Sequence, residues 1–437
     1  MGTHSQFRLL GQRRFLPFYL TQFSGAFNDN LYKNALLLLI AYQTTGMFGL
    51  SVNTVINLAA FLFILPFFLF SGIAGQAADR YEKAAIIRQV KLAEIGIMAF
   101  AALALWFGWY EGLLVLLFLM GIQSTFFGPV KYAILPQVLG EDELVGGNGL
   151  VSMGTFVAIL LGTIAAGLLM GHEAAAKLTA VGVLLLAIFG YLAARQIPET
   201  ISEGSGVTGT GPAVQFRPVR ETWQLMVVAS ERKPVLWAIL AISWFWFLGA
   251  AYLTQFPNFA HSNLHGDETV VTLLLSMFII GISIGSMMCE RLTRHRITLA
   301  PVLWGALGLS LLGVDLFFAV PASPEPSTWW TLVTDPVYIR VLLDLVGIGV
   351  CGGLFIVPLY AFIQHETPSL KRARIIAALN VVNALFMVMS ALAGILVLGV
   401  FNVGIPTFLL LLSLVNGFVL VAVWRLRQIT SSSAVDK

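Results

Sequence analysis

Twelve long apolar runs follow one another along the chain, separated by short polar segments or by Gly and Pro. Each run is long enough to cross a bilayer, which takes about 20 apolar residues in a helix. The runs are continuous, whereas the strands of a transmembrane barrel alternate apolar and polar side chains. The pattern predicts an all-α polytopic membrane protein with 12 transmembrane helices. The predicted spans are residues 16–43, 52–76, 92–109, 113–138, 145–170, 177–195, 235–259, 269–290, 298–320, 337–363, 375–399 and 405–424.

The widest polar break lies at residues 198–233, where a stretch of Gly, Ser and Thr cannot bury a core. Six predicted spans lie on either side of it. Three positions recur in both halves at similar separations: Gly75 and Gly285, Pro129 and Pro358, and Asn148 and Asn380. We therefore expect two parallel repeats, an N-terminal six-helix bundle at 1–197 and a C-terminal six-helix bundle at 234–437, joined by a cytoplasmic linker at 198–233. Such repeats place a substrate site between them, near the middle of the bilayer.

Composition narrows the function classes. Hydrophobic residues make up 58% of the 437 residues and charged residues 11%, whereas an ordinary soluble domain carries about 25% charged residues. The two cysteines lie in separate apolar runs and offer neither a disulfide framework nor a metal-ligand spacing. No nucleotide-binding loop, zinc-ligand spacing or nucleophile elbow occurs in the sequence. We therefore expect no enzyme, no catalytic residue, no metal, no cofactor and no nucleic-acid partner.

The basic residues predict the orientation in the membrane. All but four of the 25 Lys and Arg residues fall beside predicted spans on the same side as the N-terminus. The exceptions are Lys33 and Lys131, which lie inside spans, and Lys177 and Arg340 on the other side. Basic residues near span ends are retained in the cytoplasm, so both termini are expected to be cytoplasmic.

The first span carries polar residues near its middle: Asn28, Asp29, Asn30 and Lys33. A charge at that depth costs about 2.5 to 3.5 kcal/mol on insertion scales, and such residues usually face an internal cavity on a transport path. The alternative is that Asp29 and Lys33, one turn apart, only neutralise each other. Because amide side chains flank the pair, we expect all four residues to contact a substrate.

The fourth span repeats this pattern with Gln123 and, nearer its cytoplasmic end, Lys131 and Tyr132. Lys131 is a candidate cation for a substrate phosphate, with Gln123 and Tyr132 beside the same path. The alternative is that the long Lys131 side chain extends outward to the membrane surface.

The loop after the second span contains Gly75, Asp79 and Arg80. This spacing resembles the signature of the major facilitator superfamily, which is Gly, three residues, then Asp and a basic residue. In that family the Asp faces the positive end of a helix from the other half and holds the cytoplasmic side shut. The resemblance implies that Asp79 lies near the start of the eleventh span, close to Arg372 and Arg374. The alternative is a plain basic loop with one acid.

The second half contains a degenerate copy of this motif. Gly285 is present, but Cys289 stands at the position of the Asp. The resemblance therefore implies a gating contact in one half only.

Three further segments resemble the bacterial lysophospholipid transporter branch of that superfamily: Phe27-Asn28-Asp29-Asn30, Gly128 to Pro136, and Gly147-Asn148-Gly149-Leu150. The similarity is especially close to the membrane domain that some bacteria fuse to an acyltransferase. It adds Asn148 to the expected substrate contacts.

One feature departs from that branch. Its free-standing members carry an Arg in the seventh span that is thought to pair with the acid of the first span, and this span has no Arg here. It offers Gln255 instead, which we expect to contact the substrate. Either Lys131 or Lys33 then pairs with Asp29, or the salt-bridge step of transport works differently.

The resemblance implies a monomeric lysophospholipid transporter, or flippase, in the bacterial inner membrane. The expected partners are a lysophospholipid substrate, the membrane lipids and a separate cytoplasmic acyltransferase that restores the missing chain. Two other functions are open at this point. One is proton-coupled transport of a soluble drug or metabolite through Asp29, and the other is a membrane anchor for an acyltransferase that transports nothing.

Overall fold

The computed structural model describes residues 5–43, 49–200, 217–321 and 325–435. Within them, twelve helices have 20 or more residues. They are α1 (Leu16–Gln43), α2 (Val52–Arg80), α3 (Lys83–Phe107), α4 (Tyr110–Ala133), α6 (Leu144–Met170), α7 (Ala175–Ala194), α9 (Lys233–Asn263), α10 (Glu268–Thr293), α11 (Ala300–Ala319), α13 (Pro336–Glu366), α14 (Ser369–Gly394) and α15 (Ile405–Val435). In the described residues, eleven of these helices are long and apolar enough to span a membrane. The twelfth is α1, whose polar residues interrupt an otherwise apolar helix of 28 residues. The prediction of an all-α protein with 12 transmembrane helices is confirmed.

Several helix boundaries differ from the predicted spans, and one helix was not predicted. Helix α3 begins at Lys83, nine residues before the apolar run, because Glu82 caps it by accepting a hydrogen bond from the backbone N–H of Ala85. Helix α4 ends at Ala133, and the short α5 (Leu135–Val138) follows it with Pro136 in its first turn. The segment predicted as a linker contains a helix, α8 (Pro218–Ser230), that apolar runs did not reveal.

The chain forms two compact units. Unit 1 consists of residues 1–140, 157–229 and 367–381, and unit 2 of residues 141–156, 230–366 and 382–437. Helices α6 and α14 therefore contribute residues to both units. The division into bundles at 1–197 and 234–437, which follows chain order rather than contacts, stays a prediction.

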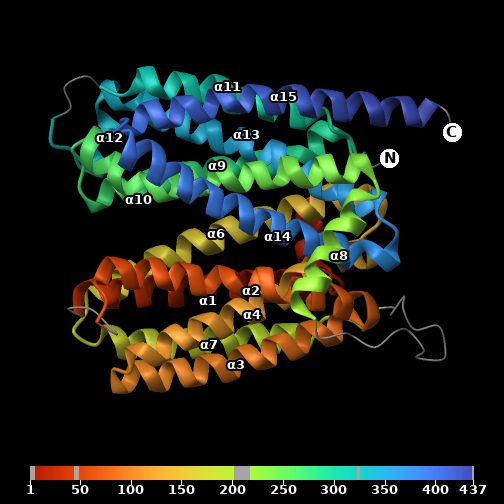
Figure 1. Cartoon of the computed structure of the whole chain (residues 1–437), viewed down its shortest axis with the longest axis horizontal. Helices are drawn as coiled ribbons and strands as arrows, with labels where there is room; N and C mark the ends of the chain where they lie inside the picture. The colour runs from red at the N-terminus through yellow and green to blue at the C-terminus, as the bar shows by residue number, and fades with distance from the viewer. Residues whose placement is uncertain (1–4, 44–48, 201–216, 322–324, 436–437) are drawn as a thin grey trace. The chain divides into compact units, whose positions relative to one another are not determined.

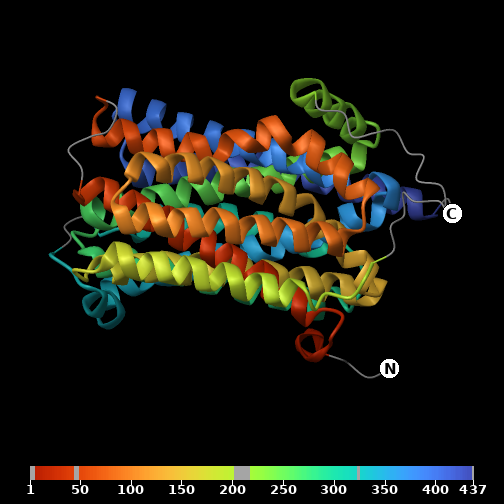
Figure 2. The same cartoon turned by 90° about the horizontal axis from the view of Figure 1, so that it is seen from below.

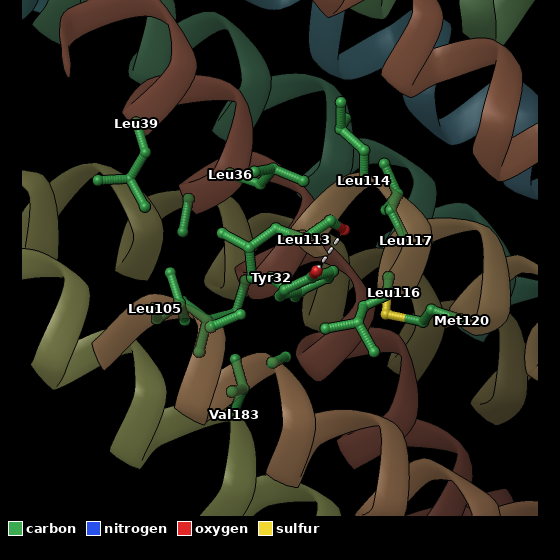
Figure 3. Close-up of a cluster of buried hydrophobic side chains, with 14 of the residues drawn as sticks. Tyr32, Leu36, Leu39, Leu105, Leu113, Leu114, Leu116, Leu117, Met120 and Val183 are labelled. Carbon is green, nitrogen blue, oxygen red and sulfur yellow. Dashed lines mark hydrogen bonds between the residues drawn. The ribbon is translucent and has the colours of Figure 1, made fainter. Parts of the chain in front are cut away.

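Unit 1 has an apolar core among the red to yellow helices α1, α2, α3, α4 and α7, which lie side by side in Figures 1 and 2. Tyr32 of α1 lies at the centre of this core, 1% exposed, and its hydroxyl donates a 2.7 Å hydrogen bond to the carbonyl of Leu113 in α4. Figure 3 shows leucines of α1, α3 and α4, with Met120 and Val183, surrounding the ring. The hydroxyl is satisfied, so the aromatic ring stabilises the core without an unpaired polar atom.

Unit 2 depends on close contact between α10 and α13. A Cβ added at Gly281 would lie 2.2 Å from the carbonyl oxygen of Val346, and one at Gly285 would lie 2.0 Å from that of Val350. Only glycine permits this separation, and small residues at four-residue spacing are the usual basis of tight helix pairs in membranes.

Candidate functional site

The central polar residues of α1 lie within unit 1 and face two neighbouring helices. Asp29 accepts a 3.0 Å hydrogen bond from the hydroxyl of Ser124 in α4. Asn28, which is fully buried, donates a 3.0 Å bond to Glu94 in α3. Lys33 donates to Asn30 over 3.3 Å on the same helix. Asp29 is thus bonded across to α4 rather than sealed against Lys33 alone.

Glu94 forms the centre of a buried network that the sequence reasoning missed. It is 1% exposed and accepts bonds from Lys91 at 2.6 Å, from Gln123 at 2.9 Å and from Asn28. The single proton of the Ser124 hydroxyl is shared between Asp29, at 3.0 Å, and the Oε1 of Gln123, at 3.3 Å, so the network continues to Asp29. Asn28 and Gln123, both predicted to contact substrate, here hold a buried carboxylate in place.

Lys91 is enclosed because two glycines leave room for it. A Cβ at Gly25 in α1 would lie 2.4 Å from the Nζ of Lys91, and one at Gly190 in α7 would lie 3.6 Å from it. The ammonium group also lies 5.4 Å from the ring centroid of Phe127 in α4. The prediction placed Lys91 in the loop before the third span. This was wrong, since Lys91 lies inside α3 and is 1% exposed.

Charges of both signs surround Asp29. Glu94, whose carboxylate is paired with Lys91, acts electrostatically on Asp29, as do Lys91 and Lys33, and Asp29 acts on Lys131 in the last turn of α4. Lys33 also lies 5.8 Å from the ring of Phe63, and Lys131 lies 5.3 Å from the ring of Tyr132. The first and fourth spans thus bring Asp29, Lys33 and Lys131 into one charged region of unit 1.

Two buried oxygens in this region lack hydrogen-bond partners. They are the Oδ1 atoms of Asp29 and Asn28, which receive no donor from any residue that the structure describes. A buried acceptor without a donor costs about 1 to 3 kcal/mol, and more when it is charged. An unpaired carboxylate oxygen inside a membrane helix is therefore suited to a ligand that brings its own donor.

Three of the predicted gating residues, Gly75, Asp79 and Arg374, meet at the N-terminal end of α14, also within unit 1. Asp79 is 8% exposed and accepts 3.0 and 2.9 Å bonds from the backbone N–H of Ala373 and the Nε of Arg374. A Cβ at Gly75 would contact the Cβ of Ala377 at 2.9 Å, so this glycine allows α2 to approach α14. The carboxylate faces the positive end of a helix, where a negative charge is stabilised.

The other two residues of that set are placed differently. Arg372 donates to the carbonyl of Thr367 over 3.2 Å, and the guanidinium of Arg80 lies 5.7 Å from the ring of Tyr81. Lys83, three residues after Arg80, is 2% exposed and acts electrostatically on Asp79.

Asn148 and Gln255, the last two predicted substrate contacts, belong to unit 2. Asn148 is fully buried and exchanges two hydrogen bonds with Gln364 of α13, at 2.6 and 3.1 Å. Gln255 in α9 is half-buried and accepts a weak 3.5 Å bond from Asn258. The buried amide pair links α6 to α13 through two hydrogen bonds. Its role in substrate binding stays a prediction.

The comparison with protein families decides the assignment. The model of the Major Facilitator Superfamily matches residues 18–391. The chain belongs to the major facilitator superfamily. It is therefore a multi-pass membrane transporter and not an enzyme.

Solved structures and curated relatives agree with this family. The human organic anion transporter MFSD10 has a TM-score of 0.75 at 12% identity and covers 94% of this chain and 99% of its own. The fucose:proton symporter FucP of E. coli has a TM-score of 0.68 at 14% identity, with coverages of 95% and 99%. These likenesses show the fold alone.

The resemblance to the lysophospholipid transporter branch is confirmed by named relatives. The lysophospholipid transporter LplT of Serratia proteamaculans is 27% identical over 363 residues, which are 81% of this chain and 80% of that protein. The transporter of the same name from Cronobacter sakazakii is 26% identical over 360 residues, 82% and 81% of the two chains.

Proposed function

We propose that this protein moves lysophospholipids across the bacterial inner membrane, with both termini in the cytoplasm, so that a separate cytoplasmic acyltransferase can restore the second chain. The observation that carries the proposal is the unpaired Oδ1 of Asp29 near the charges of Lys33 and Lys131. A head group with an ammonium and a phosphate complements a region in which the acid Asp29 and the cations Lys33 and Lys131 lie together. The names of the similar transporters support this substrate class.

Physical chemistry indicates which part of the substrate needs the protein. Lifting a sixteen-carbon tail out of lipid costs on the order of 12 kcal/mol, at about 0.8 kcal/mol for each methylene group. The tail therefore stays in apolar surroundings while the polar head follows the protein. In this proposal the head contacts Asp29, Asn30, Lys33 and Lys131, and Glu94 with its bonded neighbours keeps α1, α3 and α4 in register.

Movement of the head across the membrane requires two alternating states. The repeats of the family rock around a bound substrate, and a contact made in only one state shifts the balance between the two. We assign that contact to Asp79 with Ala373 and Arg374, because it joins the end of one membrane helix to the start of another.

Replacing Asp29 with Asn tests the proposal. The variant keeps the size of the side chain and removes its charge, so the ammonium of the head group loses a charged acceptor. Such hydrogen bonds contribute about 1.5 to 3 kcal/mol, and we expect uptake of fluorescent lysophosphatidylethanolamine into reconstituted vesicles to fall about tenfold or more. Asp142→Asn, the same change at an exposed position outside the spans, is the matched control and should keep the full rate.

The same vesicles separate the competing functions. Unchanged uptake by Asp29→Asn would remove Asp29 from the site. Flux of a water-soluble solute that an uncoupler abolishes, with no flux of the lipid, would favour a proton-coupled transporter. A protein that binds an acyltransferase and carries no flux at all would act as an anchor.

A further inference from the structure

Helix α8 is fixed along one side of α2 within unit 1. Its residues Glu221, Leu225 and Ala229, spaced four apart, are 4%, 2% and 3% exposed. The hydroxyl of Thr222 donates a 3.0 Å bond to the carbonyl of Phe68 in α2. A Cβ at Gly72 would lie 2.6 Å from the Cβ of Glu221, so the two helices touch at this glycine. The helix is therefore built into the structure of unit 1.

A cavity of about 210 Å³ lies beside this contact. Its polar walls are Gln76 of α2, Glu221 and Gln224 of α8 and Arg374 of α14, and its apolar wall is Leu225, Val227 and Val228. Ligand pockets for whole small molecules usually measure about 300 to 1,000 Å³. This cavity is smaller and fits a polar head group rather than a lipid with its chains.

Glu221 has an unusual environment for a buried acid. Among the residues that the structure describes, its carboxylate accepts one side-chain hydrogen bond, which comes from the neutral amide of Gln76. Buried charges are normally paired with an opposite charge. The carboxylate is therefore arranged to receive a cation from outside the chain.

Arg374 supplies the opposite charge on another wall of the cavity. Its Nε donates to Asp79, while its side chain remains 40% exposed. A guanidinium carries five N–H donors in a planar fork that suits a phosphate. One wall thus suits a cation and another suits a phosphate, within a space of head-group size.

The face of α8 beside the cavity is apolar and exposed. Trp223 is 71% exposed and Val227, one turn further, is 52% exposed. Trp is enriched where membrane and water meet, because its ring is apolar and its N–H is polar. An acyl chain attached to a head group in the cavity has an apolar surface along which to leave.

We propose that the cavity between α8, α2 and α14 binds the phosphoethanolamine head group of a membrane lipid, with its ammonium on Glu221 and its phosphate on Arg374. This is a second lipid site, separate from the Asp29 region. Because Arg374 also holds Asp79, lipid in this cavity acts on the proposed gating contact. That last step rests on the proposed function, whereas binding itself does not.

Binding of short-chain lipids to the purified full-length protein in detergent tests the site. The signal is the fluorescence of Trp223, obtained by subtracting that of a Trp223→Phe variant, since the chain has 10 Trp. We expect dihexanoyl phosphatidylethanolamine to bind about tenfold more tightly than dihexanoyl phosphatidylglycerol, which has the phosphate without the ammonium. Glu221→Gln should abolish this preference, and Glu111→Gln, at an exposed position in the first turn of α4, should retain it.

A pair of glycine variants makes the test independent of charge. Gly72→Ala pushes α8 away from α2 and should also abolish the preference, whereas a Cβ at Gly96 meets nothing within 4 Å, so Gly96→Ala should retain it. Equal binding of the two lipids by the unmodified protein, or a preference that survives both Glu221→Gln and Gly72→Ala, would overturn the proposal. If the unmodified protein shows this preference but takes up no lysophospholipid into vesicles, the proposed function is contradicted and the binding site is not.

Discussion

The starts of α14 and α6 are held in place by different chemistry. In unit 1, the start of α14 contacts the end of α2 through a charge, since Asp79 accepts bonds from Ala373 and Arg374. In unit 2, the start of α6 contacts the end of α13 through two neutral amides, Asn148 and Gln364. Gly75 lets α2 approach α14 beside the charged contact, whereas Gly149 of α6 lies against Ser286 of α10 rather than against α13. The two contacts differ in polarity.

The positions that recur between the halves sharpen this contrast. Asn380 of α14 corresponds to Asn148 in the sequence, yet its Nδ2 donates to no acceptor among the described residues, and a Cβ at Gly128 would lie 2.5 Å from that atom. Cys289 of α10 corresponds to Asp79, is fully buried, and donates weakly to carbonyls of its own unit, at 3.4 and 3.6 Å. In the described part of the chain, neither the charged contact nor the amide pair recurs at the corresponding position of the other half. We infer that the charged contact is the one that opens and that the amide pair stays closed.

Removing the charge of Asp79 should have the largest effect. Asp79→Asn weakens the bond from Arg374 and the attraction to the positive end of α14, which together contribute about 1.5 to 3 kcal/mol. We expect the ratio of open to closed states on that side to rise about tenfold or more, measured by labelling of single introduced cysteines in a cysteine-free background. Arg374→Gln should act in the same direction.

Arg195→Gln is the matched control for this change, because Arg195 is exposed at the end of α7. Its effect on labelling should be clearly smaller. Equal labelling of Asp79→Asn and the unmodified protein would show that the contact does not gate, whatever its geometry.

Breaking the amide pair should reduce stability rather than change labelling. Asn148→Leu leaves the buried amide of Gln364 without this partner, which costs about 1 to 3 kcal/mol. The double change Asn148→Leu with Gln364→Leu removes both polar groups and should recover most of the loss. Thermal unfolding of the purified protein in detergent measures the three variants, and a double-mutant cycle gives the coupling between the two residues.

Asn258→Leu provides the control, since Asn258 is exposed on α9. It should leave the unfolding midpoint nearly unchanged. Additive losses in the double variant would mean that the two amides do not stabilise the protein as a pair.

Hydropathy was sufficient to find the spans because each must present a continuous apolar surface to lipid. It also located Asp29, Lys33 and Lys131, since charges inside an apolar run stand out. Lys91 and Glu94 did not stand out, because Lys91 precedes the predicted run 92–109 and Glu94 is only its third residue, at an end where charges are expected near the membrane surface. Only the folded chain shows that α3 begins earlier and that Gly25 makes room for the Lys91 ammonium.

The sequence around a residue does not indicate which distant segment that residue contacts. Asn148 and Gln364 are 216 residues apart, and nothing near either residue indicates the other. Helix α8 follows a Gly/Ser/Thr stretch, and its apolar positions serve a short surface of α2 rather than a membrane span. The Asp79 contact was foreseen through a family resemblance, which supplied long-range information that spacing alone lacks.

The smallest expected effect is that of salt on the open-to-closed ratio, which should depend on the Asp79 contact and not on the pair of Asn148 and Gln364. The Debye length falls from about 10 Å at 0.1 M to about 3 Å at 1 M, so salt screens charges that reach solvent. Arg374 is 40% exposed in its contact with Asp79, and pairs that reach solvent are worth less than about 1 kcal/mol. The open-to-closed ratio should therefore rise less than about fivefold over this range. Asp79→Asn should lose that response, whereas Asn148→Leu should retain it, because the amide pair carries no charge for salt to screen. If the ratio of Asp79→Asn still rises with salt, the salt-sensitive contact lies elsewhere. The Asp79 contact would then not be the charged gate that distinguishes it from the neutral amide pair.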